Sequence, residues 1–247
     1  MAKVEFKNVD ANYKNSKQIA LNNVSFAIEE GEMVAIIGPS GAGKSTIFNS
    51  ILRQLNISGG QILIDNKNIY DLKKREWKKI VKKIGFLSQE ANVIEDLNVY
   101  ENILHFYSKY KNFLYSWLKI LNKKQKIEIY EILDKLGIFN KSFTKVSELS
   151  GGQKQRLQIA QLLLQDVSII LADEPTSNLD IQTASNVLEI LNKISKEYNK
   201  TILTNIHDLT LLKKYFKKYI FVRDGKIVEI DSTTNLTKAK QKKLYSD

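Results

Sequence analysis

The chain opens with apolar residues at alternate positions, which is the pattern of strands that have one buried face. Val4 and Phe6 alternate with charged residues, and Val24, Phe26 and Ile28 repeat the pattern further along. These two stretches predict a small antiparallel sheet at the start of the chain.

Three runs predict strands: residues 33–37 are continuously apolar and fit a strand buried on both faces, residues 167–172 predict a second buried strand, and residues 201–206 predict a third strand. Apolar residues at helical spacing follow each run: Ile47, Ile51, Leu52 and Leu55; then Val187, Ile190, Leu191 and Ile194; then the stretch 209–216. Strands that alternate with helices predict an α/β fold with a mostly parallel sheet.

Two further segments complete the predicted organisation. Asp224-Gly225 lies between two apolar stretches and is a strong signal for a β-hairpin. Residues 91–148 show no strand pattern and are rich in Lys, Tyr, Leu and Ile, which indicates an inserted helical subdomain. We therefore expect one domain over 1–247, with an α/β core at 1–90 and 149–230, a helical subdomain at 91–148 and a C-terminal tail at 231–247.

Composition narrows the class of protein. The chain has 247 residues, of which 43% are apolar, and this suits a single domain with a sizeable core. Its apolar runs are far shorter than the roughly 18 residues of a membrane span, and its first residues resemble no secretory signal, so we expect synthesis and residence in the cytoplasm. The absence of cysteine excludes disulfides, thiolate zinc sites and a cysteine nucleophile.

The net charge of +11 is an excess of lysine. Only four of the 38 basic residues are arginine, namely Arg53, Arg75, Arg156 and Arg223. Lysine lacks the forked guanidinium that contacts base edges through two hydrogen bonds, so we expect no nucleic-acid partner. A basic face beside anionic lipid headgroups stays open, although the sequence does not locate it.

A glycine-rich segment after the first buried strand predicts a nucleotide site. It reads Gly38-Pro39-Ser40-Gly41-Ala42-Gly43-Lys44-Ser45 and fits the pattern G-x-x-x-x-G-K-[ST]. Its backbone N–H groups can surround phosphate oxygens, Lys44 can reach the β- and γ-phosphates, and Ser45 can bind Mg²⁺. We therefore expect the chain to bind a nucleoside triphosphate.

Two more segments carry candidate chemistry. Asp173 and Glu174 end the second buried strand, at the sheet edge where the phosphate loop should lie. Asp173 can hold Mg²⁺ through water, and Glu174 can polarise a water that attacks the γ-phosphate. Leu149-Ser150-Gly151-Gly152-Gln153 precedes a helical pattern and is either a second anion site or an ordinary helix cap.

GPSGAGKST at 38–46, LSGGQ at 149–153 and ILADE at 170–174 together resemble the nucleotide-binding subunit of ATP-binding cassette (ABC) transporters. The resemblance covers essentially the whole chain and implies a P-loop NTPase fold of the ABC type, with a small antiparallel β subdomain and a helical insert. It implies ATP hydrolysis, with Lys44, Glu174 and His207 in catalytic roles. It also implies that ATP binds with Mg²⁺, the metal held by Ser45, Gln89 and Asp173.

Other positions match family motifs. Tyr13 resembles the aromatic residue that stacks on adenine, Gln89 the Q-loop glutamine, and His207 the switch histidine that contacts the γ-phosphate. Ser177-Asn178-Leu179-Asp180 resembles the D-loop. The nucleotide would contact Tyr13, Gly38, Pro39, Ser40, Gly41, Ala42, Gly43, Lys44, Ser45, Thr46 and Gln89 of one subunit and Ser150, Gly151, Gly152 and Gln153 of the other, because two such subunits sandwich two ATP molecules head to tail.

The resemblance also indicates partners. Residues 106–126 and 204–228 and the final LTKAKQKKLYSD are similar to the phosphonate-import branch, which implies a homodimer on membrane permease subunits at the cytoplasmic face of the membrane, served by an extracellular solute-binding protein. ILADEPTSNLD is also similar to efflux and lipoprotein-release ATPases, so an export system is the alternative. A soluble ABC ATPase of iron–sulfur assembly has a similar length and stays open as well.

Overall fold

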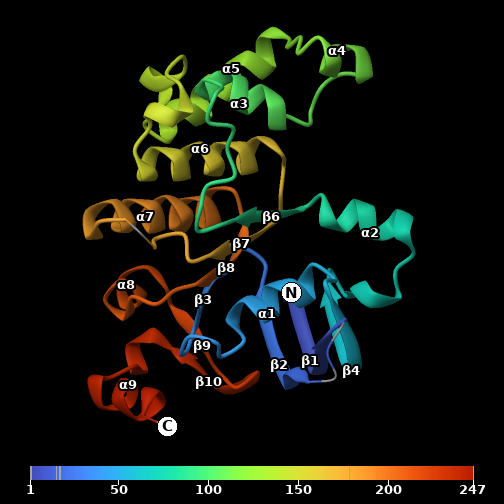
Figure 1. Cartoon of the computed structure of the whole chain (residues 1–247), viewed down its shortest axis with the longest axis vertical. Coiled ribbons are helices and arrows are strands. Elements are labelled where there is room, and N and C mark those ends of the chain that lie inside the picture. Colours follow the sequence, from blue (N-terminus) through green and yellow to red (C-terminus); the bar gives the residue numbers. More distant parts are fainter. Residues whose placement is uncertain (1, 15, 17, 178, 247) are drawn as a thin grey trace.

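Two sheets organise the fold, which is a computed structural model that describes residues 2–14, 16, 18–177 and 179–246. The first sheet is antiparallel, with strand order β2-β1-β4-β5 (Figure 1). It contains β1 (Ala2–Tyr13), β2 (Ile19–Glu29), β4 (Leu55–Ile64) and β5 (Lys67–Asn68). The predicted antiparallel sheet is confirmed: Phe6 lies opposite Phe26, and their rings stack with centroids 4.4 Å apart.

The second sheet has six strands in the order β10-β9-β3-β8-β7-β6. They are β3 (Met33–Ile37), β6 (Ile84–Leu87), β7 (Ile169–Asp173), β8 (Thr201–Asn205), β9 (Lys218–Arg223) and β10 (Lys226–Ser232). All neighbours are parallel except β9 and β10, so the mostly parallel sheet is confirmed. The predicted hairpin at Asp224-Gly225 joins β9 to β10, with φ angles of 48° and 69° that suit its tight turn.

The parallel sheet separates two hydrophobic cores. Side chains of a strand point alternately to its two faces, so Val34 and Ile36 of β3 enter the core shared with the antiparallel sheet. Ala35 and Ile37 enter the core under the helices on the opposite face. Because both faces are covered, every residue of β3 is buried, which explains its continuous apolar sequence.

Three helices follow the predicted strands, and a fourth, α6, begins after Ser150 and precedes β7. They are α1 (Lys44–Ile51), α6 (Gly151–Leu164), α7 (Ile181–Glu197) and α8 (Leu209–Tyr215). The prediction that α1 continues to Leu55 is wrong, because the chain turns at Arg53 with a φ of 58° and β4 begins at Leu55. The helical spacing of Leu55 after Ile51 was coincidental.

Residues 91–148 form the end of the molecule at the top of Figure 1. They contain α3 (Val99–Phe106), α4 (Phe113–Trp117), α5 (Lys123–Lys135) and the 3-10 turns η2 (Phe139–Lys141) and η3 (Val146–Glu148). The only β pairing in the described part of this segment is the single bridge between Asn98 and Lys145, so the predicted absence of strands is confirmed. None of the described helices is long and apolar enough to span a bilayer.

Two helices lie apart from these layers. Helix α2 (Lys74–Val81), with the 3-10 turn η1 (Ile69–Asp71) before it, lies at the right-hand side of Figure 1. Helix α9 (Lys238–Tyr245), preceded by η4 (Thr233–Asn235), forms the C-terminal end beside β9 and β10.

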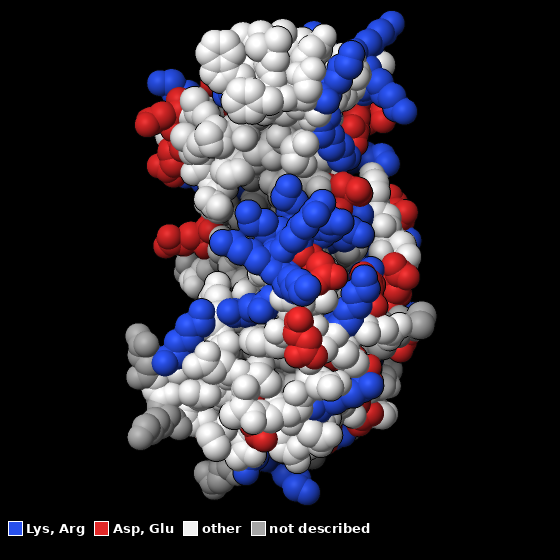
Figure 2. Space-filling view, turned by 90° about the vertical axis from the view of Figure 1, so that its right-hand side faces the viewer, with Lys and Arg blue, Asp and Glu red and all other residues white. Residues whose placement is uncertain are grey.

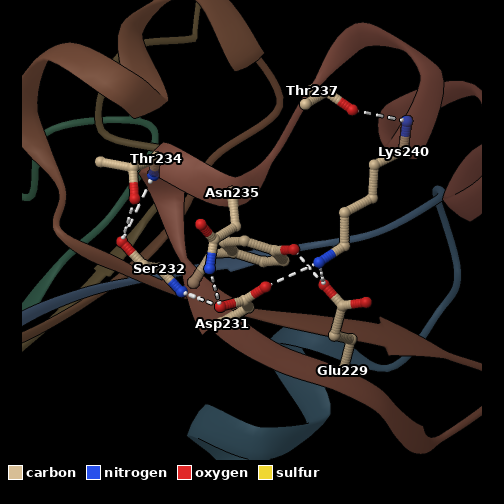
Figure 3. A network of polar contacts seen from close by, with 8 residues as sticks. Glu229, Asp231, Ser232, Thr234, Asn235, Thr237 and Lys240 are labelled. Atoms are coloured by element: carbon tan, nitrogen blue, oxygen red, sulfur yellow. Dashed lines mark hydrogen bonds and ion pairs between the residues drawn. The ribbon is translucent and has the colours of Figure 1, made fainter.

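A polar network attaches α9 to the hairpin (Figure 3). Lys240 Nζ lies 2.6 Å from Asp231 Oδ2 and 2.7 Å from Glu229 Oε1, and Tyr219 donates to Glu229 as well. The hydrogen bonds from Lys240 and Asn235 lower the pKa of Asp231 to about 2, and the two carboxylates raise the pKa of Lys240. These contacts fix α9 on the outer edge of the sheet.

The last turn of α9 also reaches the phosphate loop. Burial raises the pKa of the Tyr245 hydroxyl, and a hydrogen bond from the backbone N–H of Gly38 opposes that rise. The Tyr245 ring packs edge-on against Phe221, with centroids 5.2 Å apart, and Arg223 donates to the carbonyl of Leu244. The C-terminal helix therefore ends on the first residue of the glycine-rich segment.

Candidate nucleotide-binding site

The register of the parallel sheet brings three functional segments to one edge. Asp173, at the end of β7, lies opposite Asn205 of β8, which in turn lies opposite Ile36 of β3. The phosphate loop begins directly after β3, and His207 follows β8 by two residues. Carboxyl ends of parallel strands form the usual ligand site of open α/β sheets, and this geometry follows from the strand order alone.

The phosphate loop depends on glycine at two positions. Gly38 has a φ of 149°, and a Cβ atom there would lie 2.1 Å from the carbonyl oxygen of Val222. Gly43 caps the N-terminus of α1 with a φ of 103°, a conformation that L side chains rarely adopt. The loop thereby leaves the N–H groups at the start of α1 free to meet an anion.

Lys44 lies folded back over this loop. Its Nζ donates to the carbonyls of Gly38 and Pro39, both at 2.9 Å, and the side chain is almost fully buried. Burial lowers the pKa of Lys44, while the nearby carboxylates of Glu174 and Asp173 oppose that shift. A phosphate group would give this buried ammonium a stronger acceptor than two neutral carbonyls.

Asp173 gathers two polar partners at the end of β7. Ser45 Oγ donates to Asp173 Oδ1 at 3.2 Å, and Asn205 Nδ2 donates to the same oxygen at 2.6 Å. A hydroxyl and a carboxylate thus lie together beside the phosphate loop. Mg²⁺ takes oxygen ligands and needs only one or two from the protein when phosphates supply others, so this pair fits the metal.

Glu174 pairs with His207 across the strand ends. His207 Nε2 lies 2.6 Å from Glu174 Oε1. The backbone of Glu174 has a φ of 51°, in the left-handed region that costs energy for a residue with a Cβ atom. Its N–H donates to the carbonyl of Asn205 and its carbonyl accepts from Ser177, and these bonds hold the strained conformation.

A pocket of about 620 Å³ lies over these groups. Its walls come from the strands of the antiparallel sheet, the phosphate loop and the ends of β7 and β8. The lining residues are Tyr13, Ser16, Gln18, Ile19, Ala20, Ser40, Gly41, Gly43, Lys44, Ser45, Thr46, Glu174, His207, Asp224 and Gly225. Tyr13, predicted to stack on adenine, stands in the wall with its hydroxyl 3.3 Å from Thr46 Oγ1.

Several predicted residues do not line this pocket. Gly38, Pro39 and Ala42 support the loop from behind, and Asp173 reaches it through Ser45. Gln89 is exposed after β6, with no part in the described lining. Asn178, in the segment that resembles the D-loop, lies outside the described residues.

Ser150, Gly151, Gly152 and Gln153 also lie away from this pocket, at the start of α6. Ser150 caps the helix: its Oγ accepts from the N–H of Gln153, whose side chain accepts from the N–H of Ser150. Gly152 is required by packing, because a Cβ atom there would lie 2.3 Å from the side chain of Thr183 in α7. Within one chain the segment is therefore a helix cap.

The structure adds residues that the sequence did not single out. Gln155 of α6 donates to the carbonyls of Ser88 and Gln89 at 3.2 and 3.0 Å, and Gln158 donates to the carbonyl of Phe86 at 3.3 Å. Both glutamines are buried. They tie the helix that begins at Ser150 to the segment that carries Gln89.

The hairpin turn is a second addition. Gly225 donates from its N–H to the carbonyl of Ala42 at 2.9 Å, and it lines the pocket with Asp224. The Asp-Gly signal predicted a turn but not its position, because only the folded sheet brings it to the phosphate loop.

Comparison with known proteins identifies the family. The family model described as ABC transporter matches residues 21–177, which include the phosphate loop, Ser150–Gln153 and the Asp173-Glu174 pair. The chain belongs to the ABC transporter family. It is an ABC ATPase, a protein that binds ATP and hydrolyses it.

Relatives of this ABC ATPase match it over most of their length. It is 36% identical to "Phosphonates import ATP-binding protein PhnC 2" of Oceanobacillus iheyensis over 247 residues, which is 100% of this chain and 94% of the other. It is 35% identical to "Probable ABC transporter ATP-binding protein p29" of Mesomycoplasma hyorhinis, over 90% of this chain and 88% of that one.

Solved structures agree with the fold of this ABC ATPase. The cbiO1 protein of Clostridium perfringens, part of the ABC transporter complex cbiONQ, superimposes with a TM-score of 0.84 at 25% identity, covering 98% of this chain and 93% of that one. The cassette MJ0796, in a dimeric post-hydrolysis state bound to ADP and Pi, gives a TM-score of 0.73 at 34% identity, covering 93% of this chain and 98% of that one.

Proposed function

We propose that this ABC ATPase powers a membrane importer for a phosphonate or another small organophosphorus anion. The observation that carries the proposal is the meeting of Lys44, Glu174 and His207 in one pocket, in a chain that matches a phosphonate-import ATP-binding protein over its full length. The pocket supports ATP hydrolysis as the energy source, and the relatives support import as the direction of transport and a phosphonate as the class of solute.

ATP binding is assigned to the phosphate loop. The N–H groups at the start of α1 surround the phosphates, and Lys44 leaves the carbonyls of Gly38 and Pro39 for the β- and γ-phosphate oxygens. Tyr13 contacts the adenine from the pocket wall. Thr46, whose hydroxyl lies 3.3 Å from that of Tyr13, lines the pocket between the phosphate loop and Tyr13.

Ser45, Asp173 and Gln89 would hold Mg²⁺. When bound there, the metal would supply positive charge to offset the negative charge of the phosphates during transfer. Ser45 Oγ and the Asp173 carboxylate already lie together, and Asn205 keeps that carboxylate oriented. Gln89 would have to move from its exposed position to reach the γ-phosphate side.

Glu174 and His207 would carry hydrolysis. Glu174 accepts a hydrogen bond from the water that attacks the γ-phosphate, so that the water is oriented in line with the breaking bond. His207 holds the Glu174 carboxylate at 2.6 Å and can pass to a γ-phosphate oxygen once ATP is present. This exchange of partner would make the pair sensitive to the γ-phosphate.

Two copies of the chain would enclose the nucleotides. The exposed cap at Ser150 lies apart from the pocket of its own chain, and its helix N-terminus offers N–H groups to a second copy's γ-phosphate. The dimeric cassette MJ0796, similar over 93% of this chain, supports that arrangement. ATP would then stabilise the closed dimer, and loss of the γ-phosphate would release it.

The dimer would act at the cytoplasmic face of the cell membrane, where it would bind permease subunits. An extracellular solute-binding protein would deliver the solute to those subunits. The segment with Gln89 and the helical residues 91–148 would dock on the permease. Gln155 and Gln158 support this coupling, because they tie the Gln89 segment to the helix whose first residue meets the partner's ATP.

Affinity capture of Glu174→Gln in the presence of ATP, from detergent-solubilised membranes, tests this proposal. The variant should hold ATP in a stable dimer and recover a permease together with a solute-binding protein, which can then be assayed against phosphonates and phosphate esters. Lys44→Ala, which should bind ATP more weakly and therefore form less of the dimer, is the matched control. Recovery of export components or of soluble iron–sulfur assembly proteins would refute the import assignment.

A further inference from the structure

Two segments account for the whole positive excess of this chain. Residues 73–83 contain seven basic residues and one acidic residue, and residues 102–127 contain six lysines and no acidic residue. The complete chain has a net charge of +11, so the remaining residues carry no positive excess. The charge is therefore concentrated rather than spread for solubility.

The first segment is α2 with its flanking residues. Trp77 and Ile80 pack against the core of the antiparallel sheet and fix one face of the helix. The guanidinium of Arg53 lies over the Trp77 ring, 5.2 Å from its centroid, and holds it further. The exposed residues are Lys73, Lys74, Arg75, Lys78, Lys79, Lys82 and Lys83, and none of them has an ion-pair partner in the described part of the chain.

The second segment surrounds α4 and exposes apolar side chains. Phe113 is 85% exposed and Trp117 is 71% exposed, one helical turn apart on the same face. Leu114, Leu118 and Ile120 are also exposed beside them. Isolated apolar residues on a surface are ordinary, but five together form a patch of the kind that marks an interaction site.

Lysines border this apolar patch. Lys111, Lys119, Lys123, Lys124 and Lys126 are exposed around it, and Lys109 pairs with Glu128 at 2.7 Å. Amphipathic surface segments that bind membranes combine Trp, Phe and Leu on one side with Lys at the border. The composition of the α4 region matches that chemistry.

Both segments face the same side of the molecule. Helices α2 and α4 extend to the right in Figure 1, and Figure 2 looks directly onto that side. Lys and Arg side chains gather across its middle, at the level of α2, and an uncharged cap with Lys side chains at its edge covers the end that carries α4. One flat surface can therefore meet both.

We propose that α2 and the α4 region form a membrane-binding face that recognises anionic lipid headgroups. The lysines of α2 meet headgroup phosphates, and Phe113 and Trp117 insert at the level of the headgroups. Twelve of the thirteen basic residues in the two segments are lysine. The lysine ammonium is a point charge that suits a phosphate group, whereas specific contacts with nucleic-acid bases favour the forked guanidinium of arginine. The exposed leucines and isoleucine find an apolar partner in lipid and none in a nucleic-acid backbone.

This inference goes beyond the proposed function, since it needs neither a permease nor a solute. Sedimentation of the purified chain with vesicles of phosphatidylcholine, with and without phosphatidylglycerol, tests it directly. We expect binding only to the anionic vesicles, with affinity that falls as salt rises. Lys78→Ser/Lys79→Ser should weaken that binding by about 25-fold, because one lysine near an anionic surface contributes about five-fold.

Matched variants distinguish binding through this face from a general effect of the protein's net charge. Lys242→Ser/Lys243→Ser removes the same charge from α9, outside both segments, and should leave most of the binding intact. Phe113→Ser should weaken binding, whereas Phe143→Ser, which removes another highly exposed ring outside the patch, should not.

Trp117 offers an internal reporter, because the chain has only two tryptophans. In Trp77→Phe the emission comes from Trp117 alone, and we expect a blue shift with anionic vesicles. Unshifted emission, no binding to anionic vesicles at low salt, or equal loss in the test and control variants would each overturn the proposal. So would binding that requires a permease and ignores lipid charge, which would make the face a protein-docking surface.

Discussion

His207 Nε2 and Glu174 Oε1 lie 2.6 Å apart in the wall of the nucleotide pocket. The two residues follow different strands, Glu174 after β7 and His207 after β8. We therefore expect the histidine to orient the carboxylate, so that loss of either side chain changes the rate of hydrolysis more than the binding of ATP.

His207→Ala should lower the rate of ATP hydrolysis by about 100-fold, the usual effect of losing one group that positions a proton acceptor. ATP affinity should change little, because in the proposed site Lys44 and the loop N–H groups, and not His207, would provide most of the contacts with the phosphates. Phosphate release and nucleotide binding measure the two effects separately. His105→Ala removes the other histidine, exposed on α3, and should match the unaltered chain; equal losses in both variants would remove His207 from the site.

The backbone at Glu174 makes a second prediction, about stability. A residue with a Cβ atom at a φ of 51° costs about 1 kcal/mol relative to glycine. Glu174→Gly should therefore have a free energy of unfolding about 1 kcal/mol higher than Glu174→Ala, while both lose hydrolysis. Urea denaturation of the two variants measures the difference. Equal or greater stability of Glu174→Ala would contradict the cost assigned to the left-handed backbone at this position.

Lys44→Ala should weaken ATP binding by about ten- to a hundred-fold, since hydrogen bonds to charged groups contribute about 1.5–3 kcal/mol. The fold should survive, because the neutral carbonyls of Gly38 and Pro39 lose only a donor that ATP would take from them. Titration with a fluorescent ATP analogue gives the affinity. Lys83→Ala, at an exposed lysine outside the pocket, is the control, and unchanged ATP binding in Lys44→Ala would refute the assigned phosphate cradle.

Buried glutamines of α6 give a matched pair of stability predictions. Gln155→Leu keeps the volume but removes the donor to the carbonyls of Ser88 and Gln89, so it should lower the free energy of unfolding by about 1–3 kcal/mol. Gln161→Leu removes a buried Nε2 that has no partner in the described structure, so it should be neutral or stabilising. Urea denaturation distinguishes them, and equal effects would contradict the role given to Gln155.

The attachment of α9 should depend on pH in two windows. The pKa of Asp231 is lowered to about 2, so its contribution is complete above about 4 and disappears as pH falls through about 2. The pKa of Lys240 is raised above 10.5, so its contribution is complete below that value and disappears as pH rises beyond it. Amide hydrogen exchange of α9 should accelerate at both extremes, and Asp231→Asn should remove the acid-side change.

Much of the fold was predictable because local pattern and final environment agree. The apolar run 33–37 predicts a strand buried on both faces. The structure confirms it, because helices cover one face of β3 and the antiparallel sheet covers the other. The phosphate loop and the Asp173-Glu174 pair were predictable for the same reason, because their spacing relative to a strand fixes their position at the sheet edge.

Other parts depend on contacts that no local pattern contains. Strand β4 includes Ser58-Gly59-Gly60, which interrupts the apolar pattern by which a strand is predicted. A Cβ atom at Gly60 would lie 2.2 Å from the carbonyl oxygen of Lys7, so the close approach of β1 requires glycine there. Gln155 reads as an ordinary polar helix position, and only the packing of α6 against residues 88–89 makes it a donor. The left-handed backbone of Glu174 is likewise set by Asn205 and Ser177, from outside its own strand.

The hydrogen bond between Gly38 and Tyr245 has a practical consequence for anyone who handles the protein. A purification tag, fluorescent fusion or surface tether joined after Asp247 would pull on α9, whose last residue contacts the phosphate loop. A pulling force or steric crowding at that position would disturb Tyr245 and, through its hydrogen bond, Gly38. The nucleotide affinity measured on such a fusion would include that disturbance. A tag placed before β1 is joined to the antiparallel sheet instead and leaves the contact between Tyr245 and Gly38 untouched.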